Sequence, residues 1–168
     1  YWAGDGTANT TKVNTSSIEV SNINPIIILS SPNNDTYTTD NTPNFVFTAT
    51  DRDNSTFSCE LFINETGYGT EIATNNTETT ITTNTSLDDD VYSFYINCSD
   101  ESGIGSSETR TITIDTTDPV ATIENPSASE EFLKNETTNT TINLNYTITD
   151  DNTDSCWYSL NDGSNVSL

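Results

Sequence analysis

Acidic side chains gather in three short stretches of the sequence. Asp51 and Asp53 lie in DRD, residues 88–90 form a run of three Asp, and Asp115 and Asp118 lie in DTTDP. Carboxylates supply the oxygen ligands that Ca²⁺ requires, six to eight of them at roughly 2.4 Å. These acids are therefore candidate calcium ligands. A solvated acidic surface with no bound ion is the alternative explanation.

The sequence also contains many acceptor sites for N-linked glycans, which attach to Asn in the pattern Asn-X-Ser/Thr. It has 12 such sequons, against roughly 7 expected from its content of Asn, Ser and Thr. Most lie in expected loops, and two lie on expected strands with side chains that alternate outward. We expect dense N-glycosylation, with composition alone as the alternative. The sequons begin at Asn9, Asn14, Asn34, Asn54, Asn64, Asn75, Asn84, Asn97, Asn135, Asn139, Asn145 and Asn165.

Catalytic chemistry finds little support in the sequence. The chain has no His, which removes the usual general base and any triad of the Ser-His type. Paired carboxylates could serve a glycosidase or an aspartic protease, but they occur in short loops with no sign of a pocket that would bury them. We expect no enzymatic activity and no required cofactor, with Ca²⁺ as the one ion to consider.

The charge balance limits the partners of the protein. Its formal net charge is -22, from 26 acids against 4 Lys and Arg. Such a field repels nucleic acids and anionic lipid surfaces. The longest apolar run, PIIIL, is far shorter than the roughly 20 residues that span a bilayer. We expect neither a nucleic-acid partner nor membrane insertion.

The elements that position these residues are strands. Apolar residues occur in short alternating runs rich in Ile, Val, Phe, Tyr and Thr, which is typical of half-buried β-strands. No stretch has a helical period, so we expect an all-β fold. The predicted strands lie near residues 26–29, 45–50, 57–63, 70–73, 79–83, 91–98 and 109–114.

The sequence repeats itself. At an offset of 94, PIIILSSP (Pro25–Pro32) aligns with PVATIENP (Pro119–Pro126), and both prolines stay in register. At an offset of 97, FSCELFIN (Phe57–Asn64) aligns with DSCWYSLN (Asp154–Asn161). A period near 95 residues with the same order of strands predicts tandem β-sandwich modules.

The repeat also sets the expected module boundaries. SSIEV (Ser16–Val20) aligns with RTITI (Arg110–Ile114), so residues 1–23 are expected to be the last two strands of a preceding module. Residues 24–117 form a complete module, and residues 118–168 form the first three strands of a following one. We expect the two end segments to belong to a longer chain. The alternative is a sandwich shared between subunits, in which the end segments complete each other.

Several motifs carry a family resemblance: SCELFIN, SCWYSLN, VYSFYINCSD, YWAGDGTANTT and DTTDP. Together they resemble the tandem immunoglobulin-like repeats of prokaryotic, especially archaeal, surface proteins. The resemblance covers essentially the whole chain. It implies tandem immunoglobulin-like (Ig-like) β-sandwich domains and an extracellular or cell-surface location, but no enzymatic activity, because the family is defined by its scaffold.

The Ig-like arrangement predicts a disulfide. In such a sandwich the strands near 57–63 and 91–98 are antiparallel neighbours, which places Cys59 beside Cys98 on the inward face. We expect them to form a disulfide, with two buried free thiols as the alternative. Cys156 takes the place of Cys59 in the repeat, so it is expected to be unpaired within this sequence. A reactive thiol is the alternative for Cys156. Disulfides of this kind imply an oxidising, extracytoplasmic setting.

The same arrangement gives the calcium prediction a location. In tandem sandwiches the acidic loop and the linker at the end of one module face a loop of the next. Six acids would converge there, although Ser21 and Asn24 replace two of them at the preceding junction. The candidate metal ligands are Asp88, Asp115, Asp118, Asp150, Asp151 and Asp154.

The sequence as a whole predicts a structural, N-glycosylated extracellular filament or cell-surface stalk. Its expected partners are neighbouring copies or domains of the same protein and its own glycans. The alternative is an adhesin module that binds a surface glycan or another cell. Clustered exposed aromatic residues would favour adhesion, but Tyr37, Tyr68 and Trp157 are scattered along the sequence.

Overall fold

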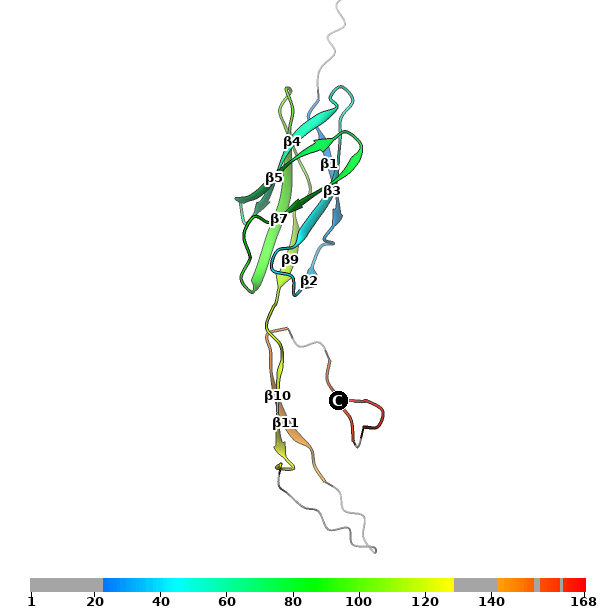
Figure 1. Cartoon of the computed structure of the whole chain (residues 1–168), viewed down its shortest axis with the longest axis vertical. Coiled ribbons are helices and arrows are strands. Elements are labelled where there is room, and N and C mark those ends of the chain that lie inside the picture. The colour runs from blue at the N-terminus through cyan, green and yellow to red at the C-terminus, as the bar shows by residue number, and fades with distance from the viewer. Residues whose placement is uncertain (1–22, 129–141, 153–154, 161) are drawn as a thin grey trace, which may run out of the picture.

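A computed structural model describes residues 23–128, 142–152, 155–160 and 162–168 (Figure 1). These residues form strands and connecting loops and contain no helix. The expected strands within residues 1–22 lie outside the described part. The strands are β1 (Ile26–Ser31), β2 (Thr36–Thr38), β3 (Asn44–Thr50), β4 (Thr56–Ile63), β5 (Thr66–Thr74), β6 (Thr77–Thr82), β7 (Asp90–Ser99), β8 (Ile104–Ser106), β9 (Arg110–Ile114), β10 (Val120–Asn125), β11 (Asn145–Thr149), β12 (Trp157–Tyr158) and β13 (Val166–Ser167).

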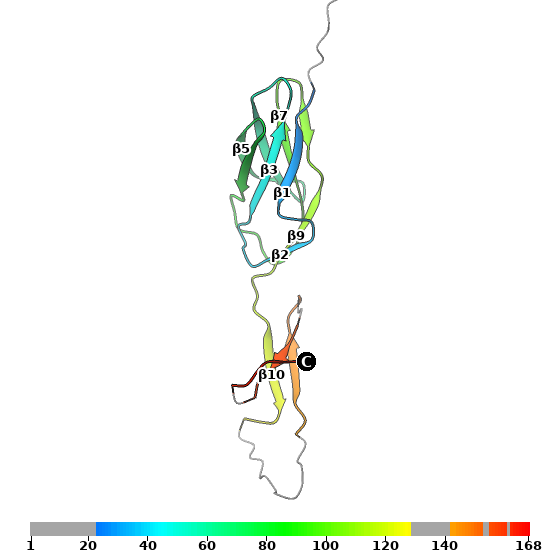
Figure 2. The ribbon, with the colours of Figure 1, turned by 90° about the vertical axis from the view of Figure 1, so that its right-hand side faces the viewer.

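The first nine strands form a β-sandwich of two sheets (Figures 1 and 2). One sheet has the order β1-β3-β6, and the other has the order β2-β9-β7-β4-β5, with β8 added beside β7. All neighbours are antiparallel except β2 and β9, which run parallel. The chain crosses between the sheets from β5 to β6, so these two strands lie at the same open side of the sandwich. The all-β, Ig-like fold expected from the sequence is confirmed.

The core lies between the two sheets and follows the alternation of the strands. Phe45 and Phe47 of β3 face Leu61 of β4 and Phe94 of β7, and all four side chains are fully buried. The rings of Phe45 and Phe94 meet edge to face with centroids 4.7 Å apart. Burying a side chain of this size contributes about 1.5–3 kcal/mol, so the sandwich depends on these inward positions.

The seven strands predicted in this region are all present, and two more are found. β2 and β8 have three residues each, too few to show an alternating pattern. β5 begins at Thr66, earlier than its apolar residues indicate, because Gly67 and Gly69 interrupt the pattern. Tyr92, which alternates with the buried Phe94 and Ile96 of β7, is half-buried and packs against the core.

The strands after the sandwich form two hairpins. β10 pairs with β11, and β12 pairs with β13. The β10–β11 ladder has the same pattern as the β1–β3 ladder: partner numbers are 94 higher on the first strand and 99 higher on the second. Both ladders shift register at the equivalent position, after Leu29 and after Ile123. The following X-Pro peptide bond, before Pro32 or Pro126, is cis in both.

The two equivalent hairpins differ in burial. Leu29 is 4% exposed in the sandwich, whereas its counterpart Ile123 is 62% exposed. Within the described residues, no second sheet packs on β10 and β11. The β12–β13 ladder repeats β4–β5 in the same way, because Trp157 pairs with Ser167 as Glu60 pairs with Thr70, each number 97 higher. The two hairpins therefore have the local structure of a sandwich without its core.

Candidate functional site

The disulfide predicted between Cys59 and Cys98 is confirmed. The two residues are direct partners in the β4–β7 ladder, with Cα atoms 4.0 Å apart and a sulfur–sulfur distance of 2.08 Å. Both are fully buried. The bond joins neighbouring strands of one sheet and closes a loop across a sequence separation of 39, so it holds the centre of the larger sheet together.

The third cysteine, Cys156, is free and half-buried. The chain has three cysteines, and the other two are bonded to each other, so Cys156 has no disulfide partner within this sequence. It directly precedes β12, the strand whose ladder repeats β4. Cys156 thus occupies the position of Cys59 in the second set of strands.

A single carboxylate fixes the linker between the sandwich and β10. Asp89, just before β7, accepts hydrogen bonds from the backbone N–H and the hydroxyl of Thr116, both at 2.8 Å. Its other oxygen accepts one from the Thr117 hydroxyl at 2.7 Å. The hydrogen bond from Thr117, followed by those from Thr116, holds the pKa of the Asp89 carboxyl below its usual value. These contacts tie the linker to the end of the sandwich.

Acidic residues near this linker share one surface. A hollow of about 470 Å³ is lined by Asp115, Asp118, Asp150 and Asp151, among others, and the Asn152 side-chain N–H donates to Asp115 at 3.0 Å. No group of three or more acidic or cysteine side chains in the described part of the chain is arranged to hold a metal ion.

Two of the six predicted calcium ligands do not belong to this hollow as described. Asp88 does not line it, and Asp154 lies outside the described residues. Calcium binding at the junction stays a prediction.

The glycan acceptors differ in how their side chains are engaged. Asn9, Asn14, Asn135 and Asn139 lie outside the described residues. Asn54, Asn75 and Asn97 are half-buried. The remaining acceptors are exposed, namely Asn34, Asn64, Asn84, Asn145 and Asn165.

Asn75 is an acceptor whose side-chain amide is held by the backbone at both its nitrogen and its oxygen. Its side-chain N–H donates to the Asp51 carbonyl oxygen at 2.7 Å, and its side-chain oxygen accepts the Asp51 N–H at 3.1 Å. The glycan bond forms at this same amide nitrogen. Asn64 and Asn97 instead use their side-chain oxygens, which accept hydrogen bonds from Ser93 and Ser106. Their amide nitrogens are therefore easier to modify than that of Asn75.

Arg110 is a structural residue that the sequence did not single out. Its guanidinium donates to the carbonyl oxygens of Pro32 at 2.7 Å and Leu29 at 2.9 Å, and it forms an ion pair with Glu108 at 2.6 Å. These contacts join β9 of one sheet to the end of β1 in the other. The only available signal was the scarcity of cations, since the chain has four Lys and Arg in total.

Comparison with known proteins matches the sandwich to a protein family. A family model described as a bacterial Ig-like domain matches residues 30–116, slightly more than half of the chain. The matched region begins at the end of β1 and extends past β9. A search of curated proteins finds no match. In the described residues, no helix is long and apolar enough to cross a membrane.

Proposed function

The chain belongs to the bacterial Ig-like domain family, and on that premise we propose that it is a structural part of an extracellular filament or cell-surface stalk. Domains of this family are commonly extracellular, and the family is defined by a scaffold and not by a catalytic site. The proposal therefore assigns the protein a mechanical role without catalysis. The sequence resemblance to archaeal surface repeats supports a prokaryotic cell surface.

The observation that carries the proposal is the repeated ladder. The β10–β11 pairing reproduces β1–β3 at constant offsets, including the register shift, and β12–β13 reproduces β4–β5. Register is fixed by the pattern of buried side chains, and a slip of one residue would turn every side chain to the other face. Two hairpins in the same register support residues 118–168 as the first strands of a second module.

Two features of the sandwich suit a load-bearing role. The Cys59–Cys98 disulfide joins the central strands β4 and β7 of the larger sheet, so pulling on the chain cannot separate them without reducing the bond. Asp89 secures the linker through Thr116 and Thr117, which limits bending between successive modules. A structural disulfide also favours an oxidising compartment outside the cytoplasm.

Dense N-glycosylation is the second part of the proposal. Five acceptors in the described residues are exposed, and a glycan needs an exposed Asn on the surface of a secreted protein. Sugars combined with a net charge of -22 would keep neighbouring filaments apart and limit access of proteases.

Electron microscopy of the native protein tests the proposal directly. We expect fibres or stalks that show evenly spaced globular modules along their length. Images of isolated particles without any repeat along an axis would contradict a filament or stalk.

A further inference from the structure

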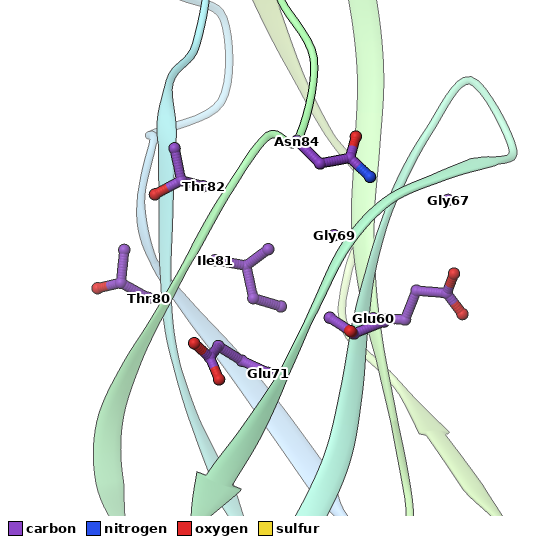
Figure 3. A pocket seen from close by; sticks show the side chains of 9 residues that line it. Glu60, Gly67, Gly69, Glu71, Thr80, Ile81, Thr82 and Asn84 are labelled. Atoms are coloured by element: carbon purple, nitrogen blue, oxygen red, sulfur yellow. The ribbon is translucent and has the colours of Figure 1, made fainter.

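A groove opens along the side of the sandwich where the two sheets come together. It lies between β5 and β6, has a volume of about 480 Å³, and does not belong to the linker or the disulfide (Figure 3). This volume falls within the roughly 300–1,000 Å³ of small-ligand sites. The residues around it include Glu60, Gly69, Glu71, Thr80, Thr82 and Asn84.

Two glycines of β5 line the groove. A Cβ atom on Gly69 would lie 2.9 Å from the Ile81 side chain and 3.0 Å from the Thr82 carbonyl oxygen, so no side chain fits there without displacing β6. At Gly67 the Glu60 carboxylate lies over the place that a side chain would take. Gly69 therefore lets β5 pack closely against β6, and the part of the groove wall that β5 contributes includes two residues without side chains.

A glycan acceptor stands at one end of the groove. Asn84 follows β6 and begins the sequon Asn84-Thr85-Ser86. Its backbone N–H donates to the Tyr68 carbonyl oxygen at 2.8 Å, which holds Asn84 against β5 between the two glycines. Figure 3 shows the Asn84 side chain near Gly69, with Glu60 and Glu71 toward the other end of the view.

The chemistry of the lining matches a neutral sugar. The Glu60 and Glu71 carboxylates are strong acceptors for sugar hydroxyl groups, and the Thr80 hydroxyl can both donate and accept. Within the part of the chain that the structure describes, the side chains of Glu60 and Thr80 make no hydrogen bond. An anionic ligand would be repelled by the two carboxylates.

We propose that the first sugars of an N-glycan on Asn84 lie in this groove and are bound by it. This inference rests on the proposed N-glycosylation of the protein. The glycan would cover the open side of the sandwich, where β5 and β6 are the edge strands of the two sheets. Covering exposed edges prevents strand pairing between molecules, so the sugar would have a structural role in addition to shielding.

Nuclear magnetic resonance on the full chain carrying its glycans tests the inference. We expect nuclear Overhauser contacts between the α protons of Gly67 and Gly69 and the ring protons of the sugar. The Ser86→Ala variant removes the sequon but keeps Asn84, and we expect it to lose every one of these contacts. The control variant Asn165→Gln removes an exposed sequon on another segment and should keep them all.

Comparing the intact mass of the native chain with that of Ser86→Ala separates the ways in which the experiment can fail. A glycan attached at Asn84 without contacts to the glycines overturns the groove site and leaves the proposed glycosylation standing. Glycans at other acceptors with none at Asn84 would likewise overturn the groove site and leave the proposed glycosylation standing. A bare chain removes both proposals. A second copy of the chain could instead pair with these strands. Protection of the Gly67 and Gly69 backbone amides from hydrogen exchange that persists in Ser86→Ala and grows with protein concentration would show such pairing and would also overturn the inference.

Discussion

Arg110 shows how one side chain joins the two sheets. Its side chain is 16% exposed, and it donates to the carbonyl oxygens of Leu29 and Pro32. Hydrogen bonds from charged groups contribute about 1.5–3 kcal/mol, so Arg110→Ala should lower the free energy of unfolding by about that amount in urea denaturation. Arg52→Ala is the matched control, because that side chain is 71% exposed. Equal losses in both variants would contradict this role.

The disulfide gives a second prediction at the scale of residues. Replacing Cys59 and Cys98 together by Ala should lower the free energy of unfolding by about 3–4 kcal/mol, as expected for closure of a loop of this length. The measurement is urea denaturation followed by circular dichroism. Cys156→Ser should change stability by less than about 0.5 kcal/mol, because Cys156 lies outside the sandwich core. An unchanged midpoint in the double variant would mean that the bond does not form.

Asp89 predicts a pH dependence for the linker. Its carboxyl pKa is lowered from 3.8 by hydrogen bonds from Thr117 and Thr116. The carboxylate therefore contributes fully above its unfolded-state pKa, and the contribution is lost as the pH falls through the lower folded-state pKa. The amide signals of Thr116 and Thr117 should titrate below pH 3.8, and Asp89→Asn should abolish that titration. Signals that titrate at or above this pH in the native chain would refute the contact.

At the scale of elements, the close packing of β5 against β6 gives a prediction for stability. Gly69→Ala places a Cβ against Ile81 and the backbone of Thr82, which should cost about 1–3 kcal/mol of stability through overpacking. Gly67→Ala is the control, because its Cβ meets the far end of the flexible Glu60 side chain, which can move away. Thermal unfolding of the two variants gives the comparison. A Gly69→Ala variant as stable as Gly67→Ala would show that β5 and β6 are not in close contact.

The elements also show how much of the fold can be predicted from the sequence. β4 and β7 were predictable because their inward residues alternate without interruption, and their pairing placed Cys59 beside Cys98. β2 was missed because it forms only by pairing with β9, a strand far along the chain. β8 was missed because its three residues, which pair with the end of β7, are too few to show a pattern. The start of β5 was missed because close packing against β6 selects Gly69 there, and local propensity disfavours glycine in strands.

The candidate sites also divide into those that the sequence locates and those that only the fold brings together. Sequons and cysteines are written in the sequence, so they could be located before the fold was known. The Asn75 contact to Asp51 and the Asp89 contact to the linker depend on loops that meet only in three dimensions. A sequon pattern therefore cannot distinguish the held amide of Asn75 from exposed acceptors such as Asn165.

At the scale of the whole molecule, the intact mass of native protein tests the glycans. It should exceed the 18.3 kDa of the polypeptide by several glycans. Peptide mapping should find the exposed acceptors Asn64 and Asn145 occupied more often than Asn75, whose amide nitrogen is engaged. A mass equal to that of the bare polypeptide, or full occupancy at Asn75, would contradict the corresponding part of the account.

The central claim is that β10 to β13 are strands of a second module, and hydrogen exchange on native assembled protein tests it most directly. The backbone amides of Ala121–Ile123 should be protected there as strongly as their counterparts Ile27–Leu29, because a packed sheet covers them. Rapid exchange of Ala121–Ile123 in the assembled protein would contradict the claim, since it would leave the second pair of strands without a core.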